Sequence, residues 1–201
     1  MVVQAKALTL VEFSMRTTWR WPRDHDEGDL IVSEMDEVIP ALVAAVQEQH
    51  ATGDHYRDDA IRQAMEHQAQ LALRPGPVRV DVIVDPPWSD GQINSVQVVT
   101  GDRPFLVDTV ASCLLRHGWR VEDVRHPIIG VKRDRGTIEA VGMPGRGGCA
   151  SESWIHIDAT APLGTDIGQA AEQLRDDLCA CLDQVVCATD DWGAMHEAML
   201  R

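Results

Sequence analysis

Asp102 and Arg103 are the residues of this chain whose types and position best suit ligand chemistry. They follow an apolar run at 96–100, predicted to be a strand, and precede a helix predicted to begin at Pro104 and to end at Gly118. The first backbone N–H groups of a helix have no internal partner, so this end favours an anion such as a carboxylate. Arg103 could hold the carboxylate of an amino acid, and Asp102 its ammonium group. The alternative is that Asp102 only caps the helix and Arg103 pairs locally.

Two further residues complete the predicted ligand-binding set. Pro104 is expected at the first helical position, where its fixed φ suits a helix and its missing N–H leaves no donor unpaired. Asp108 is expected in the second turn, where its side chain either reaches back to the loop or faces water. We therefore predict Asp102, Arg103, Pro104 and Asp108 as the residues that contact a ligand.

The cysteines and glycines of the chain are not spaced as a metal site, a disulfide framework or a dinucleotide-binding motif requires. The chain has an odd number of cysteines without the spacing of a disulfide framework or a zinc site, so they are expected to be reduced thiols that fill small gaps: Cys113, Cys149, Cys179, Cys181 and Cys187. No GxGxxG run joins a strand to a helix, so the dinucleotide fingerprint is missing. We expect no catalytic residue, no metal and no cofactor in this chain.

Composition narrows the classes of partner. The 201 residues carry a net charge of −14, which argues against binding nucleic acid or an anionic membrane surface, because both need basic patches. No run approaches the roughly 20 apolar residues of a membrane span, and the N-terminus makes a poor signal peptide. A cytoplasmic protein is the natural interpretation.

The elements that would position these residues fall into two parts. Helices are predicted at 33–50, where Pro40 marks a kink or the true start, and at 57–73, before the Pro/Gly stop at 74–77. From residue 78 the period becomes alternating, and strands are predicted at 78–84, 93–100, 119–124, 128–133, 137–141 and 153–159. The last helix carries apolar residues at alternating steps of four and three from Ile167 to Met199, so this stripe should meet a second surface beyond the sheet.

This order predicts an α+β fold, with one antiparallel sheet and both of its helices on one face, in the ferredoxin-like plan. The opposite sheet face would then be open to another module or subunit. Trp119 and Trp154 are expected to be exposed there as a hydrophobic patch, with His156 beside them. We predict Trp119, Trp154, His156 and, on the last helix, Trp192 as interface residues.

Three runs of residues resemble one protein family. The run 100–109, TGDRPFLVDT, is similar to the DxPFLVDS segment near the N-terminus of the large NAD-specific glutamate dehydrogenases of bacteria. The runs 126–134, HPIIGVKRD, and 152–157, ESWIHI, resemble the HPxxxVxRD and ESWxHxE stretches of that family. The runs occur in the family's order and with similar spacing, and the resemblance covers roughly residues 55–200.

The resemblance implies an ACT-like module ahead of a catalytic domain that this chain does not contain. NAD and the conversion of glutamate to 2-oxoglutarate and ammonia would belong to that oxidoreductase domain. ACT modules in general bind amino acids or mediate contacts between subunits. We expect a non-catalytic regulatory and assembly segment, whose partners are an amino acid, other modules of the enzyme or a second copy. The alternative is a free-standing ACT-like protein for amino-acid binding or dimerisation.

The implied domains are a poorly ordered arm at 1–27, a helical segment at 28–76 and the ACT-like domain at 77–201. An ordinary ACT module closes its sheet with a strand after the second helix, and no such strand is predicted here. We predict that the strand at 78–84 occupies that edge.

Overall fold

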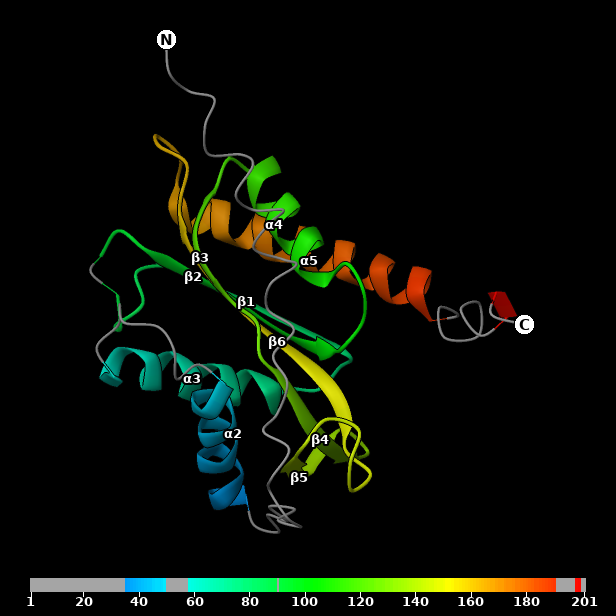
Figure 1. Cartoon of the computed structure of the whole chain (residues 1–201). Coiled ribbons are helices and arrows are strands. Elements are labelled where there is room, and N and C mark those ends of the chain that lie inside the picture. Colours follow the sequence, from blue (N-terminus) through cyan, green and yellow to red (C-terminus); the bar gives the residue numbers. More distant parts are fainter. Residues whose placement is uncertain (1–34, 50–57, 90, 191–197, 200–201) are drawn as a thin grey trace.

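A six-stranded antiparallel sheet separates two helical layers in this protein (Figure 1). The computed structural model describes residues 35–49, 58–89, 91–190 and 198–199. In Figure 1, α4 (Leu106–Arg116) and α5 (Ile167–Thr189) lie above the sheet, and α2 (Met35–Gln49) and α3 (Asp58–Ala72) lie below it. The predicted α+β fold, with N-terminal helices and a long C-terminal helix, is confirmed.

The sheet is built around its longest strand, β6 (Ala150–Thr160). One edge of β6 pairs with β2 (Asn94–Gly101). Its other edge pairs with β3 (Arg120–Arg125) along one half and with β4 (Ile128–Asp134) along the other half. The break between β3 and β4 falls at His126 and Pro127, as the proline predicts, and the Trp154 N–H still donates to the Pro127 carbonyl at 2.9 Å.

The two outer strands complete the sheet. β5 (Thr137–Gly142) forms a hairpin with β4. β1 (Val78–Ile83) pairs antiparallel with β2, from Val78 opposite Thr100 to Ile83 opposite Ser95. The prediction that this segment takes the open edge of the ACT-like sheet is therefore confirmed.

One face of the sheet is apolar and lies under α4 and α5. Every second residue of β2 and β6 points into this layer, and each large aliphatic side chain that is removed from water there contributes about 1.5–3 kcal/mol. The cluster joins the sheet to both helices through Val96, Val98, Ile155, Ile157, Val110, Leu114, Leu174, Leu178 and Leu182. The predicted stripe of α5 is buried at Ala171, Leu174 and Leu178, whereas Ile167 at its start is exposed. The next buried residue is Leu182 and not Cys181, because a straight helix repeats every 3.6 residues.

The sequence predicts the end of α4 correctly, but not its start. Gly118 has φ +74°, and the Trp119 N–H donates to the Leu114 carbonyl at 2.9 Å, so the predicted glycine stop is correct. The predicted start at Pro104 is wrong, because α4 begins at Leu106. Phe105 precedes it in the left-handed region with φ 71°, a costly conformation for an aromatic residue.

The second face of the sheet is covered by the chain's own α2 and α3. Leu42 of α2, Leu71 of α3 and Trp154 of β6 are buried together there. The expectation of an exposed hydrophobic patch on this face is therefore wrong: Trp154 is 0% exposed and His156 is 5% exposed. Trp119 is buried as well, but in the layer of α4 and α5. The alternation of a strand is the same whether its second face meets a partner or the chain's own helices.

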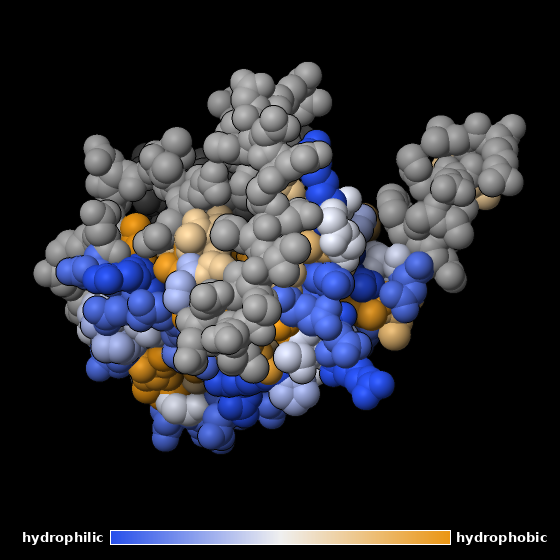
Figure 2. Space-filling model, turned by 90° about the horizontal axis from the view of Figure 1, so that it is seen from below, coloured by the Kyte–Doolittle hydropathy of each residue, from blue (hydrophilic) through white to orange (hydrophobic). Residues whose placement is uncertain are grey.

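The face of the molecule seen from below mixes hydrophilic and hydrophobic residues (Figure 2). Seen from below, the part of the surface not covered by grey atoms shows small orange hydrophobic areas among blue hydrophilic ones (Figure 2). Among the described helices, none combines the length and the apolar character needed to cross a bilayer. The predicted arm at 1–27 and Trp192 lie outside the described residues, and the division at residues 76 and 77 stays a prediction.

At Gly130 of β4 we expect even a methyl side chain to lower the stability of the fold strongly. A Cβ there would lie 2.5 Å from the Gly142 carbonyl oxygen of β5, so backbone would have to move. We expect Gly130→Ala to lower the free energy of unfolding by about 3 kcal/mol or more, measured by urea titration. Gly101→Ala is the matched control, because its Cβ would meet only the Arg103 side chain at 3.6 Å, and it should cost less than about 1 kcal/mol. Equal losses of unfolding free energy in the two variants would contradict the close backbone contact at Gly130.

Candidate functional site

The turn between β2 and α4 is fastened to β6 by a chain of polar contacts. The Asp102 N–H donates to the Ser151 carbonyl at 2.8 Å, and the Ser153 hydroxyl donates to the Asp102 carboxylate at 2.6 Å. His126 Nε2 lies 3.0 Å from the same hydroxyl oxygen, so it is the donor in that bond. One residue from each of the three runs singled out in the sequence therefore meets here.

The geometry of these contacts indicates a structural role for Ser153, and not a catalytic one. Ser153 is fully buried and gives its proton to a carboxylate, whereas a nucleophilic serine would give it to the histidine. Burial lowers the pKa of His126, and the charge of Asp102 partly opposes that effect. The contacts join the end of β2 and the break between β3 and β4 to the middle of β6.

Arg103 turns to the opposite side, toward the end of α5. Its guanidinium donates to the Val186 carbonyl at 3.2 Å, to the Thr189 hydroxyl at 3.2 Å and to the Asp190 carboxylate at 3.1 Å. The last carbonyls of a helix have no internal donor and carry partial negative charge, so a guanidinium is well suited to this place. Arg103 therefore pairs within the chain, but with a helix that is distant in the sequence and not with its own turn.

The other two residues of the predicted ligand set lie at the start of α4. Pro104 is half-buried in the turn, ahead of the helix. Asp108 lies in the first turn of α4, and not in the second, because the helix begins two residues later than predicted. Its exposed carboxylate suits the helix N-terminus. The structure thus places Asp102, Pro104 and Asp108 around one exposed turn, while the Arg103 side chain binds α5.

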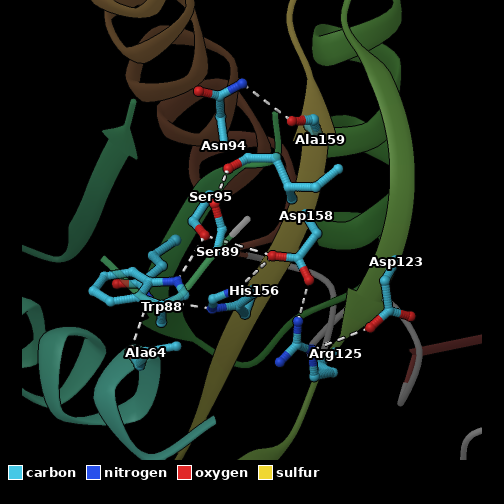
Figure 3. A network of polar contacts seen from close by, with 12 residues as sticks. Ala64, Trp88, Ser89, Asn94, Ser95, Asp123, Arg125, His156, Asp158 and Ala159 are labelled. Carbon is cyan, nitrogen blue, oxygen red and sulfur yellow. Dashed lines mark hydrogen bonds and ion pairs between the residues drawn. The ribbon is translucent and has the colours of Figure 1, made fainter. Parts of the chain in front are cut away.

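A second polar network is buried between the sheet and α3 (Figure 3). Gln97 of β2 is its centre: its amide nitrogen donates to the Ala64 carbonyl of α3 at 2.8 Å and lies 3.2 Å from His156 Nδ1. Its amide oxygen lies 2.8 Å from His67 Nδ1. Gln97 therefore ties α3 to both central strands through one fully buried side chain.

The network continues along β6 to β3. His156 Nε2 lies 3.0 Å from the Asp158 carboxylate, which also forms an ion pair with Arg125. Because Gln97 donates to Nδ1, the proton of a neutral His156 belongs on Nε2, where it faces Asp158. Burial lowers the pKa of His156, and the hydrogen bond to Asp158 opposes the shift. His156, predicted as an interface residue, is in this structure part of an internal seam.

Sequence reasoning missed the residues that complete both networks. Gln97, Ser153 and Asp158 lie on strands at positions where alternation predicts only a face, and their partners come from distant elements. The Arg133 guanidinium was missed in the same way: it holds both oxygens of Glu152 and donates to the Ala72 carbonyl at the end of α3. The one available signal was the concentration of polar types on the second face of β2 and β6.

A surface hollow lies apart from the turn between β2 and α4, and the described residues offer no metal site. A shallow hollow of about 400 Å³ lies between α3 and the loop before β2, away from the β2–α4 turn, and is lined by Ile39, Gln63, Glu66, His67, Gln70, Pro87 and Trp88. Within the described part of the chain, the histidine, cysteine and carboxylate side chains form no group of three or more that could hold a metal ion.

Comparison with protein families places the chain beside known glutamate dehydrogenase sequences. The family model described as glutamate dehydrogenase, ACT1 domain, matches residues 41–178. That span begins in α2, contains all six strands and ends in α5. No match was found among the curated proteins.

Arg103 gives the first test of the site. We expect Arg103→Ala to lower the free energy of unfolding by about 1–2 kcal/mol, because the end of α5 loses three hydrogen bonds. Arg175→Ala is the matched control, since the pair that Arg175 forms with Asp176 at 3.4 Å is exposed, and it should change stability by less than about 0.5 kcal/mol. Urea titrations of both variants make the comparison, and an unchanged stability for Arg103→Ala would refute the anchoring role.

The two buried histidines predict how stability depends on pH. The pKa values of His126 and His156 are both lowered from the usual 6.5 by burial. Below about pH 6.5 the unfolded chain therefore binds protons that the folded chain excludes, and stability falls as the pH falls, by up to about 1.4 kcal/mol per pH unit for each histidine. We expect urea titrations between about pH 7.5 and 5.5 to show this slope. His126→Gln and His156→Gln should each make this slope shallower. If both variants keep the wild-type slope, the two buried histidines are not its cause.

Proposed function

Because this chain belongs to the glutamate dehydrogenase ACT1 domain family, we propose that it is a non-catalytic regulatory and assembly module of an NAD-dependent glutamate dehydrogenase. In this proposal it works in the cytoplasm, in glutamate catabolism. NAD binding and the oxidation of glutamate to 2-oxoglutarate and ammonia are carried out by another part of the enzyme. The partners of the module are an amino acid and other modules or subunits of the same enzyme.

The order of the strands is the observation that supports this proposal best. β1, β2, β6 and the pair β3 and β4 lie side by side, with α4 and α5 on one face. This is the strand order of an ACT-like module, with one difference. The outer strand, β1, precedes the first ACT strand, β2, in the sequence, instead of following the second helix. ACT modules serve as ligand-binding and assembly units, so the sheet order favours those roles over chemistry in this chain.

For the amino-acid response, we place the ligand at the turn between β2 and α4. Asp102 and Asp108 are exposed there, and their carboxylates suit an ammonium group. The Arg103 guanidinium, which suits a carboxylate, is bound to Asp190 and the last turn of α5. A ligand carboxylate would compete with Asp190 for Arg103, and binding would release the end of α5. Such a difference in contacts between two states is what an allosteric response requires.

The alternative function is a free-standing ACT-like protein that binds an amino acid or forms dimers. The same turn and the same sheet support it, so the site alone does not separate the two. A reading frame that continues past Arg201 into a dehydrogenase domain would favour the regulatory module of an enzyme. A stop codon at that point would favour the free-standing protein.

A thermal-shift experiment with a panel of amino acids, glutamate included, tests the ligand proposal. At a ligand concentration of about 100 times Kd, binding adds about 2.7 kcal/mol, which for a chain of this size raises Tm by roughly 5–10 °C. We expect Asp108→Asn to abolish the shift and to lower Tm in the absence of ligand by only a few degrees, because Asp108 is exposed and the helix N-terminus loses one favourable charge. Glu172→Gln, an equally exposed acid on α5, is the control and should keep the wild-type shift.

Two outcomes would change the proposal. If no amino acid at millimolar concentration moves Tm, sensing is refuted and assembly is the role that remains, to be followed by light scattering. If the shift persists in Asp108→Asn and in Asp102→Asn, the amino acid binds elsewhere on the chain.

A further inference from the structure

Cys113 of α4 and Cys181 of α5 meet where the two helices pack against each other. One nitrogen of the Arg116 guanidinium, Nη2, lies 3.6 Å from the Cys113 sulfur and 3.3 Å from the Cys181 sulfur. Both sulfurs therefore lie within 3.6 Å of one nitrogen atom. Two thiols from elements far apart in the sequence therefore share one cation.

The two thiols differ in their access to solvent. Cys113 is buried, whereas Cys181 is half-buried. Burial raises the pKa of Cys113, while its hydrogen bond from Arg116 acts in the opposite direction. Cys181 is thus the thiol that a small oxidant can reach. Cys113 lies behind it as the second thiol.

The helices are held in register on both sides of this pair. His117 of the α4 end lies 2.8 Å from the Asp177 carboxylate of α5, and Arg103 binds Asp190 at 3.1 Å beyond the other end of α4. A disulfide needs Cα atoms within about 7 Å, a separation that packed helices reach where the side chains in contact are small. Cysteine is such a side chain on both helices.

We propose that Cys113 and Cys181 are a redox-active thiol pair, which a hydroperoxide oxidises to an intramolecular disulfide between α4 and α5. The Cys181 thiolate attacks one peroxide oxygen, the O–O bond breaks, and the leaving hydroxide is protonated to water. The Cys113 thiol then attacks the sulfur of the Cys181 sulfenic acid, the S–S bond forms, and a second water leaves. Two thiols lose two electrons in total, and the peroxide gains them.

The other cysteines make suitable internal standards. Cys179 is two residues from Cys181 on the same helix and points to a different side, and Cys187 is exposed on the last turns of α5. Neither shares a contact with Cys113 among the described interactions. A random oxidation would favour Cys187, whereas the proposed reaction favours the pair.

The test uses the whole reduced chain treated with an equimolar amount of hydrogen peroxide. We expect the five titratable thiols to fall to three, with the chain still monomer-sized on a non-reducing gel. Peptide mapping without reductant should show Cys113 linked to Cys181, and dithiothreitol should restore both thiols. Because the bond closes a long loop, Tm should rise by at least about 5 °C in the oxidised form.

Three variants sharpen the result. Cys181→Ser should abolish the link, whereas Cys187→Ser should leave it unchanged. Cys113→Ser should stop the reaction at a Cys181 sulfenic acid, which dimedone traps. If Cys113→Ser fails to fold, the wild-type map and Cys181→Ser still decide the matter. Arg116→Gln should slow disulfide formation by about two- to fivefold, because the two thiols lose the guanidinium that holds them side by side.

The proposal is overturned if folded wild-type chain yields no Cys113–Cys181 link. It is equally overturned if Cys181 proceeds to sulfinic acid while Cys113 stays reduced, or if the only links join separate chains through Cys187. None of these outcomes depends on amino-acid binding, so the regulatory and assembly function is tested separately.

Discussion

The burial of both faces of β6 is the constraint on which the rest of the structure depends. Ile155 and Ile157 face α4 and α5, while Trp154 and His156 face α2 and α3, and all four are buried. An alternating strand with one polar face normally leaves that face to water. Here the polar face is covered, so each polar group on it needs a partner inside the chain. Gln97 and Asp158 supply partners for His156, and the bond from Gln97 to the Ala64 carbonyl ties this face to α3.

Much of the fold was predictable because its signals are local. The glycine that ends α4, the proline between β3 and β4 and the alternation of β1 each act through the backbone of their own segment. The place of β1 at the sheet edge followed from the resemblance to an ACT-like module, because no closing strand was predicted after the second helix. Phe105 shows the limit, since a left-handed aromatic residue is imposed by the tertiary fit of the turn and has no signal in the sequence.

The candidate site was predicted only in part. The sequence places Asp102 and Arg103 at the helix mouth, but it does not show that their side chains go to opposite elements. Their partners, Ser153 and the last turn of α5, lie about 50 and 85 positions away, so no pattern of spacing reveals them. The same reasoning explains Trp154: the sequence identifies a large apolar residue on the second face, but not what covers it. Contacts between distant segments decide both cases.

The edge strand has a further consequence, for how this module folds. In an ACT-like sheet closed by its final strand, the outer pair would join the two ends of the domain. Here the arrangement amounts to a circular permutation, and β1 reaches β2 across the short connection at 84–93. The outer pair thus becomes a local hairpin, which lowers the contact order of the sheet and the entropy lost on closing the loop. An edge that would otherwise close last can form early, before its unpaired backbone can attract another chain.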